Sequence, residues 1–277
     1  MNNFWQRAIT GTVFVAIIVG AIVLGGWYMH ITFGAIVIFG LLEFYELFGK
    51  TDTHPQHILG TVLGTSIYTC LIFISEFTGN TSKYFIAATI GITLLSLIII
   101  SILELPRSKE NPFQNISITY GGIFYIVLPF ILLSVLAEAP NNYWLVLSIF
   151  ILIWCNDTFA YLTGRLIGKH KLFERISPKK TWEGFIGGII FAIIGGVTLA
   201  YFLEVSYIKY VTYAIVAGAI GTAGDLVESM LKRSVDVKDS GTILPGHGGI
   251  LDRFDAVLFV VPVIFFLEKF IFAHSID

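Results

Sequence analysis

The final third of the chain gathers acidic, basic and glycine residues between two long apolar runs. Residues 225–255 hold six carboxylates and four cations: Asp225, Glu228, Asp236, Asp239, Asp252, Asp255, Lys232, Arg233, Lys238 and Arg253. Carboxylates suit a hard divalent cation, whereas lysine, arginine and glycine-rich backbone suit phosphates. Only 13% of the chain is charged, and ionisable groups beside membrane spans are costly and usually functional. This pattern predicts a metal-dependent membrane enzyme that handles phosphates.

Two pairs of carboxylates have helical spacing. Asp225 precedes Glu228 by three residues, and Asp252 precedes Asp255 by three, so each pair lies on one helix face. The first pair ends one apolar run and the second begins the next, so we expect the pairs to face each other at the membrane boundary. Negative charge in the first turn of a helix is also favourable by itself. Helix capping and interfacial salt bridges are therefore the structural alternative.

A glycine-dense segment, residues 245–249 (Pro-Gly-His-Gly-Gly), directly precedes the second pair. Backbone amides freed by glycine can cradle phosphate oxygens next to a helix N-terminus, although glycine clusters also occur in plain turns. The charged neighbours Lys238, Asp239 and Arg253 favour the functional interpretation. We expect His247 to contact a phosphate or to transfer a proton.

A second polar group lies upstream, in residues 156–161 and 177–184. Asp157 falls near the end of an apolar run, where a carboxylate needs a partner or water. Two cations and two hydroxyls that suit an anionic substrate follow: Ser177, Lys179, Lys180 and Thr181. The alternative is a polybasic loop attracted to anionic lipid headgroups. That alternative accounts for Lys169 and Lys171 but not for the compact Ser-Pro-Lys-Lys-Thr-Trp-Glu-Gly pattern.

The elements that must position these residues are membrane-spanning helices. The chain has 277 residues, of which 56% are hydrophobic, and a mean hydropathy of +0.82. A helix of about 20 apolar residues crosses a bilayer, and nine runs reach that length: 8–25, 27–48, 58–76, 84–103, 117–137, 142–163, 184–203, 209–230 and 251–273. The first run is interpreted as a span and not as a signal peptide, because a single Arg7 precedes it and similar runs follow.

These runs predict an all-α polytopic membrane protein with one integral-membrane domain, residues 1–277. Residues 1–140 are expected to form scaffold spans, with Glu43 and Glu46 as exceptions, and residues 141–277 to form the catalytic spans and loops. His54 and His57 have ligand-like spacing but no acidic or cysteine neighbours, so we expect a surface role for them.

The distribution of cations predicts the orientation. If nine spans alternate, fourteen of the seventeen lysine and arginine residues fall on the side of the N-terminus. Cytoplasmic loops carry an excess of such residues. The asymmetry therefore places the N-terminus and the 164–183 and 231–250 loops in the cytoplasm, and the C-terminus on the opposite face.

At residues 229–255 the sequence resembles the phosphatidate cytidylyltransferases, also called CDP-diacylglycerol synthases. The resemblance is carried by Ser-Met-Leu-Lys-Arg from Ser229, by Lys238–Asp239, and by His-Gly-Gly-Ile-Leu-Asp-Arg-Phe-Asp ending at Asp255. Segments 156–165 and 177–184 resemble that family's cytoplasmic motifs as well. The resemblance implies a nucleotidyltransferase that joins CTP and phosphatidic acid to give CDP-diacylglycerol and pyrophosphate. It also implies a requirement for Mg²⁺, with a second cation left open.

The resemblance gives the charged residues roles. Asp225 and Asp252 would be the primary metal ligands, supported by Glu228, Asp255 and Asp157. The triphosphate would be held by Lys232, Arg233, Lys238 and Arg253, with Gly248 and Gly249 in the phosphate cradle, while Asp239 and His247 complete the catalytic set. Segment 177–181 would hold either CTP or the lipid headgroup.

The resemblance further suggests a homodimer in a bacterial inner membrane, in contact with membrane lipids and without a nucleic-acid partner. Two alternatives stay open. A CDP-alcohol phosphotransferase would carry an Asp-Gly-x-x-Ala-Arg motif, which the sequence does not contain. An ion-coupled transporter would place charges near the middle of the membrane, whereas these charges lie at one boundary.

Overall fold

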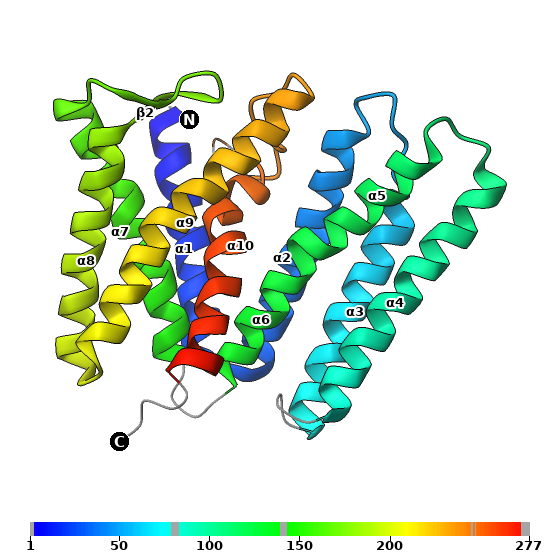
Figure 1. Ribbon diagram of the computed structural model, residues 1–277, viewed down its shortest axis with the longest axis horizontal. Coiled ribbons are helices and arrows are strands. Elements are labelled where there is room, and N and C mark those ends of the chain that lie inside the picture. The colour runs from blue at the N-terminus through cyan, green and yellow to red at the C-terminus, as the bar shows by residue number, and fades with distance from the viewer. Residues whose placement is uncertain (1–2, 79–82, 139–142, 245, 247, 273–277) are drawn as a thin grey trace. The chain divides into compact units, whose positions relative to one another are not determined.

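The computed structural model describes residues 3–78, 83–138, 143–244, 246 and 248–272, which are almost entirely helical (Figure 1). The chain divides into two compact units. The first consists of Met1–Tyr143 with Val235–Asp252, and the second of Trp144–Ser234 with Arg253–Asp277. The segment 235–252, which holds much of the predicted site, therefore belongs to the unit built from the N-terminal helices.

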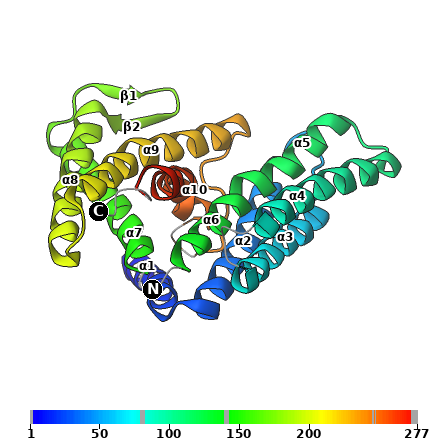
Figure 2. The same ribbon diagram turned by 60° about the horizontal axis from the view of Figure 1, so that its bottom comes forward.

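In the first unit the helices follow one another with short connections. They are α1 (Asn3–Leu24), α2 (Gly26–Phe48), α3 (His57–Thr78), α4 (Lys83–Glu104), the 3₁₀ turn η1 (Leu105–Arg107), α5 (Pro112–Gly122), the π-helical η2 (Ile123–Val127) and α6 (Leu128–Ala137). The boundary between α1 and α2 lies at Gly25 and Gly26, both with positive φ, which glycine adopts without a steric penalty. Figure 2 shows α3 and α4 side by side in this unit.

The second unit contains α7 (Tyr143–Ile167), β1 (Lys171–Phe173), β2 (Ser177–Thr181), α8 (Trp182–Leu203), α9 (Tyr207–Ser234), most of α10 (Leu251–Phe266) and the π-helical η3 (Leu267–Ile271). Helices α8 and α9 lie side by side (Figure 2) and approach closely where glycine residues face the neighbouring helix. A Cβ atom on Gly196 would lie 2.7 Å from the backbone oxygen of Tyr210, so only glycine permits this approach.

Seven of the described helical segments are long and apolar enough to cross a bilayer: 26–48, 57–75, 83–107, 112–137, 143–167, 182–203 and 207–234. The prediction of an all-helical membrane protein is confirmed at this level. The apolar helical segments at two other expected spans, 8–25 and 251–273, are shorter than these seven segments. The apolar part of α1 is Ala8–Leu24, and α10 has 16 residues with Pro262 inside before the π-helical turn begins. The count of nine spans stays a prediction.

The predicted loop of residues 164–183 is not purely a loop. It contains an antiparallel hairpin in which Lys171 pairs with Thr181 and Phe173 with Ser177. The ammonium group of Lys171 donates to the backbone oxygen of Pro178 at 2.6 Å and ties the two strands together. Strands this short show no alternation of apolar and polar residues, so the sequence pattern did not reveal them.

Candidate active site

The second unit brings together four carboxylates from three helices, here termed the acidic cluster: Asp157 on α7, Asp225 and Glu228 on α9, and Asp255 on α10. Asp255 lies within electrostatic range of Asp225, Glu228 and Asp157, and Asp157 lies within range of Asp225 as well. Nearby like charges destabilise one another unless cations neutralise them. The acidic cluster therefore favours a cation or a cationic side chain strongly.

Gly224 explains how α10 comes close enough to α9 to complete the acidic cluster. A Cβ atom on Gly224 would lie 2.7 Å from the backbone oxygen of Asp255 and 2.9 Å from the ring of Phe259. Any side chain larger than hydrogen would therefore push the first turn of α10 away from α9. Because Asp225 is the next residue along the chain, this close contact sets its separation from Asp255.

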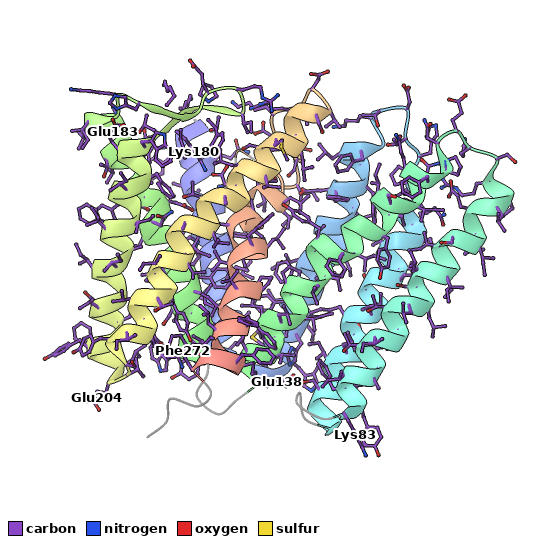
Figure 3. The ribbon with its side chains drawn as sticks, viewed as in Figure 1. Lys83, Glu138, Lys180, Glu183, Glu204 and Phe272 are labelled. Atoms are coloured by element: carbon purple, nitrogen blue, oxygen red, sulfur yellow. The ribbon has the colours of Figure 1, made fainter. Side chains whose placement is uncertain are left out.

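Lysine side chains already neutralise part of the acidic cluster. The Nζ atom of Lys180, on β2, lies 2.6 Å from Oδ2 of Asp225, and Ser229 donates to Oδ1 of Asp225 at 3.2 Å. The Nζ atom of Lys232 lies 3.2 Å from Oε2 of Glu228, and both side chains are almost fully buried. Figure 3 shows Lys180 and Glu183 at the hairpin end of α8. The cationic hairpin and the acidic cluster thus form one site in this unit.

Asn156 positions Asp157, a role that the sequence interpretation did not assign. Its side chain is 1% exposed and fills the space left by two glycines, since Cβ atoms on Gly188 and Gly218 would lie 2.6 and 3.1 Å from its Oδ1. The Nδ2 atom of Asn156 donates to Oδ1 of Asp157 at 3.2 Å. The amide held between α8 and α9 therefore fixes the orientation of the neighbouring carboxylate.

The acidic cluster fits a divalent cation in its chemistry, because hard cations prefer carboxylate oxygens and this cluster is crowded with them. Within the described ranges, however, no group of three or more His, Cys, Asp and Glu side chains is arranged around one metal position. In the structure two of these carboxylates face lysines instead, since Asp225 pairs with Lys180 and Glu228 with Lys232.

The predicted substrate segment 177–181 forms β2, and its residues differ in their surroundings. Lys179 is exposed and Lys180 half-buried against Asp225. Thr181 is 7% exposed and caps α8, because its hydroxyl oxygen accepts from the backbone N–H of Gly184 at 3.2 Å. A capping role therefore accounts for Thr181 by itself, and substrate contact by Ser177 and Thr181 stays a prediction.

These surroundings sharpen an expected difference among the lysines. If Lys179 and Lys180 make charge-assisted hydrogen bonds to substrate phosphates, replacing either with glutamine should lower kcat/KM by about 10- to 100-fold. Lys169 is the matched control because its exposed side chain lies in the same loop, and its glutamine variant should stay within about twofold. Lys171 is unsuitable because it ties the hairpin together. Equal, modest losses for all three variants would show a diffuse polybasic surface instead.

In the first unit, Glu43 on α2 holds the segment 235–252. The Oε2 atom of this buried carboxylate accepts from the Ser240 hydroxyl at 3.3 Å and from the backbone N–H of Leu251 at 3.0 Å. Its Oε1 atom is buried as well. Cβ atoms on Gly241 or Gly249 would collide with the carboxylate, so both glycines make room for it.

Asp252 completes this arrangement. Its Oδ2 atom accepts hydrogen bonds from the backbone N–H groups of Ser240 at 3.1 Å and Gly249 at 2.8 Å. One carboxylate oxygen therefore links two separate positions of the segment 235–252. Gly248 has φ of +80°, a conformation that favours glycine, and a Cβ atom there would lie 2.6 Å from the same oxygen. Asp252 therefore shapes the glycine segment in addition to its predicted role as a metal ligand.

The remaining predicted residues lie mostly at surfaces. The structure leaves exposed Lys238 and Asp239 in the first unit and Arg233 and Arg253 in the second. His247 lies outside the described residues. The acidic cluster collects Asp157, Asp225, Glu228 and Asp255, whereas Asp252 belongs to the first unit.

The chain is similar to known proteins over much of its length. The profile of the cytidylyltransferase family matches residues 5–271. Phosphatidate cytidylyltransferase from Staphylococcus haemolyticus is 40% identical over 176 residues, which cover 61% of this chain and 65% of that protein. The same enzyme of Staphylococcus aureus strain COL is 38% identical over 172 residues, with 61% and 65% covered. The chain thus spans 65% of the length of these curated relatives. Because the family profile extends over nearly all of it, the chain belongs to the cytidylyltransferase family.

Proposed function

We propose that this protein transfers the cytidylyl group of CTP to phosphatidate, giving CDP-diacylglycerol and pyrophosphate. The observation that carries the proposal is the acidic cluster with Lys180 paired to Asp225, on helices of a chain in the cytidylyltransferase family. Relatives named phosphatidate cytidylyltransferase point to the same pair of substrates. The reaction brings two phosphate-bearing molecules together, so it requires a site rich in both cations and metal-binding carboxylates.

In this reaction a phosphate oxygen of the lipid attacks the α-phosphorus of CTP. The new P–O bond forms as the bond between the α-phosphorus and the bridging oxygen breaks, and pyrophosphate leaves with that electron pair. The nucleophile is already an anion, so no strong general base is needed. Catalysis then consists of holding the reactants in line and neutralising the accumulated negative charge.

Different residues of the second unit would bind the phosphates, orient a carboxylate and hold the metal ion. Lys180 and Lys179 on the hairpin, with Arg233 and Arg253 in the same unit, would bind phosphate oxygens through charge-assisted hydrogen bonds. Asn156 would keep Asp157 oriented toward the reacting groups. Asp157, Asp225 and Asp255, supported by Glu228, would hold Mg²⁺, which when bound neutralises phosphate oxygens and orients the leaving group. A role for Asp252 as a metal ligand, and a second cation, stay predictions from the resemblance.

The proposal is tested with purified protein in detergent. With CTP, Mg²⁺ and phosphatidate present, CDP-diacylglycerol and pyrophosphate should appear in equal amounts, and omission of phosphatidate or Mg²⁺ should stop both. Formation of CMP from CDP-diacylglycerol and an added alcohol would indicate a CDP-alcohol phosphotransferase. Ion flux in proteoliposomes without cytidylyl transfer would indicate a transporter.

We also infer that the site faces the cytoplasm of a bacterial cell, with nine spans and the C-terminus on the opposite side. The fourteen cations expected on the N-terminal side support this orientation. After Cys70 and Cys155 are replaced, cysteines introduced at Lys171 and Lys238 should resist an impermeant thiol reagent in intact cells and react after lysis. Labelling of either in intact cells would contradict the topology. Assembly as a homodimer stays a prediction from the resemblance.

A further inference from the structure

The first unit contains a cavity of ≈ 780 Å³ that the steps described above do not use. It lies at the end of α2, where residues 49–57 connect to α3 and where Arg107 and Lys109 follow α4. Ile243, from the segment that Glu43 holds, forms part of its wall. Binding pockets for small ligands have volumes of roughly 300–1,000 Å³, so this cavity is large enough for a headgroup and part of an attached chain.

One wall of the cavity is apolar and belongs to a membrane-spanning helix. Phe39 and Leu42 are 44% and 39% exposed, although both are large hydrophobic side chains, and Ile243 is 43% exposed. Phe39, Leu42 and Glu46 recur at the spacing of one helix face. Along this face the lining therefore changes from apolar side chains within the span to charged side chains at its end.

The other wall is predominantly cationic. The lining residues include Lys50, Arg107 and Lys109 against the single carboxylate of Glu46 among the described residues, and His54 and His57 lie beside them. Arg107 is held in place, because its Nη1 atom donates to Oε2 of buried Glu104 at 2.7 Å and to the backbone oxygen of His54 at 2.8 Å. Lys50 and Lys109 are exposed, and their chains are long enough to reach a bound anion.

We propose that this cavity binds phosphatidate, with the phosphate against Lys50 and Lys109 and the start of the acyl chains against Phe39 and Leu42. This inference rests on the proposed function for the identity of the lipid. A water-soluble nucleotide has no acyl chain to pack against an apolar wall inside a span. A neutral lipid has no negative charge to pair with the cations. An anionic lipid from the bilayer matches both walls at once.

Two neighbouring residues of α2 connect the cavity to the segment 235–252, which holds much of the predicted site. Leu42 lines the cavity, and the next residue, Glu43, holds Ser240 and Leu251. A lipid phosphate in the cavity therefore lies in the same unit as Asp239, Gly248 and Asp252, and Ile243 from the segment 235–252 lines the cavity. The N-terminal helices thus supply the site for the lipid acceptor, whereas the acidic cluster belongs to the second unit.

The kinetic test varies phosphatidate and CTP separately in mixed micelles. The double variant Lys50→Gln/Lys109→Gln should raise the KM for phosphatidate by about tenfold or more, because it removes two cations from the phosphate. The KM for CTP and kcat at saturating lipid should change less than about twofold. Lys83→Gln is the matched control, since this exposed lysine lies at the opposite end of α4 (Figure 3). An unchanged KM for phosphatidate in the double variant would overturn the inference.

A steric variant tests the apolar wall without changing charge. Leu42→Trp should weaken long-chain phosphatidate more than a short-chain analogue, because the larger ring occupies the space of the acyl chain. The exposure of Leu42 leaves room for the ring, and a thermal unfolding curve like that of the wild type verifies the fold. Equal effects on both chain lengths would contradict an acyl-binding wall.

A binding experiment separates this inference from the proposed function, since it needs no turnover. Photoactivatable phosphatidate in liposomes without CTP should cross-link to residues 39–57. Unlabelled phosphatidate should compete, but glycerol 3-phosphate and phosphatidylglycerol at equal concentration should not. Cross-linking there in a protein that lacks cytidylyl transfer would overturn only the proposed function. Absence of cross-linking in an active protein, or equal competition by either control compound, would overturn the lipid site.

Discussion

Replacement of Asp225 with asparagine is expected to lower kcat/KM by about 10³-fold, because it removes a charge from the centre of the acidic cluster. Asp225 interacts with Asp157 and Asp255, pairs with Lys180 at 2.6 Å and accepts a hydrogen bond from Ser229. Asparagine keeps the size and one oxygen, so the side chain of Ser229 retains its acceptor. The measurement is steady-state kinetics over a range of Mg²⁺ concentrations, with thermal unfolding as the test of integrity.

Asp236→Asn is the matched control for this charge removal. Asp236 is exposed and has φ of 55°, a conformation that asparagine tolerates well, so its variant should keep wild-type activity within about twofold. Raising Mg²⁺ should not restore the Asp225 variant. Near-normal kcat of that variant at saturating Mg²⁺ would remove Asp225 from the proposed metal site. Wild-type affinity for Mg²⁺ combined with a lower kcat would assign it to the positioning of Lys180 instead.

Most of the helices could be predicted because each one is encoded by a local run of apolar residues. A run of about 20 apolar residues specifies a spanning helix whatever its neighbours are, and the tight boundary at Gly25 followed directly from two adjacent glycines. The last helix was predicted less well. The expected span of 251–273 is helical to Phe266 and then π-helical to Ile271, since apolar composition does not distinguish the two hydrogen-bonding patterns.

The sequence predicted which charged residues form the candidate site, but it did not predict the side chains that they contact. Sequence spacing placed Asp225 and Glu228 on one helix face, and the structure adds that lysines from β2 and from α9 itself accompany them. The role of Asn156 depends on space provided by two glycines on other helices. Such contacts depend on how the helices pack, and no local pattern encodes them.

Glu43 shows the same limit more clearly, because 197 residues separate it from Ser240. The sequence marked Glu43 as unusual within a span but gave no partner for it. It did mark Gly249, one of the glycines that make room for this carboxylate, yet the predicted reason was phosphate binding. A glycine cluster can serve both purposes, and only the structure shows which side chain occupies the space.

Replacement of Glu43 with alanine should therefore lower kcat/KM strongly, as the replacement of Asp225 does. It leaves the Leu251 N–H and the Ser240 hydroxyl without their acceptor, at a cost of about 1–3 kcal/mol for each buried donor. The segment 235–252 would shift, and a displacement of about 1 Å can cost about 10²-fold in rate. Glu43→Gln keeps a carbonyl oxygen for both donors, so its kcat/KM should fall by less than about tenfold.

Comparison of these two variants with Asp52→Ala decides what Glu43 does. Asp52 is exposed in the turn after α2 and is not among the residues that line the cavity, so it should tolerate alanine with a change of less than about threefold. If Glu43 acts by holding the segment, Glu43→Ala should also make residues 235–252 more susceptible to limited proteolysis, whereas Glu43→Gln should not. Equal losses of activity in both Glu43 variants, with unchanged proteolysis, would mean that its charge and not its hydrogen bonds is required. In that case Glu43 would belong among the groups that interact with a bound cation. Asp252, which already interacts electrostatically with Glu43, would be another member of that group.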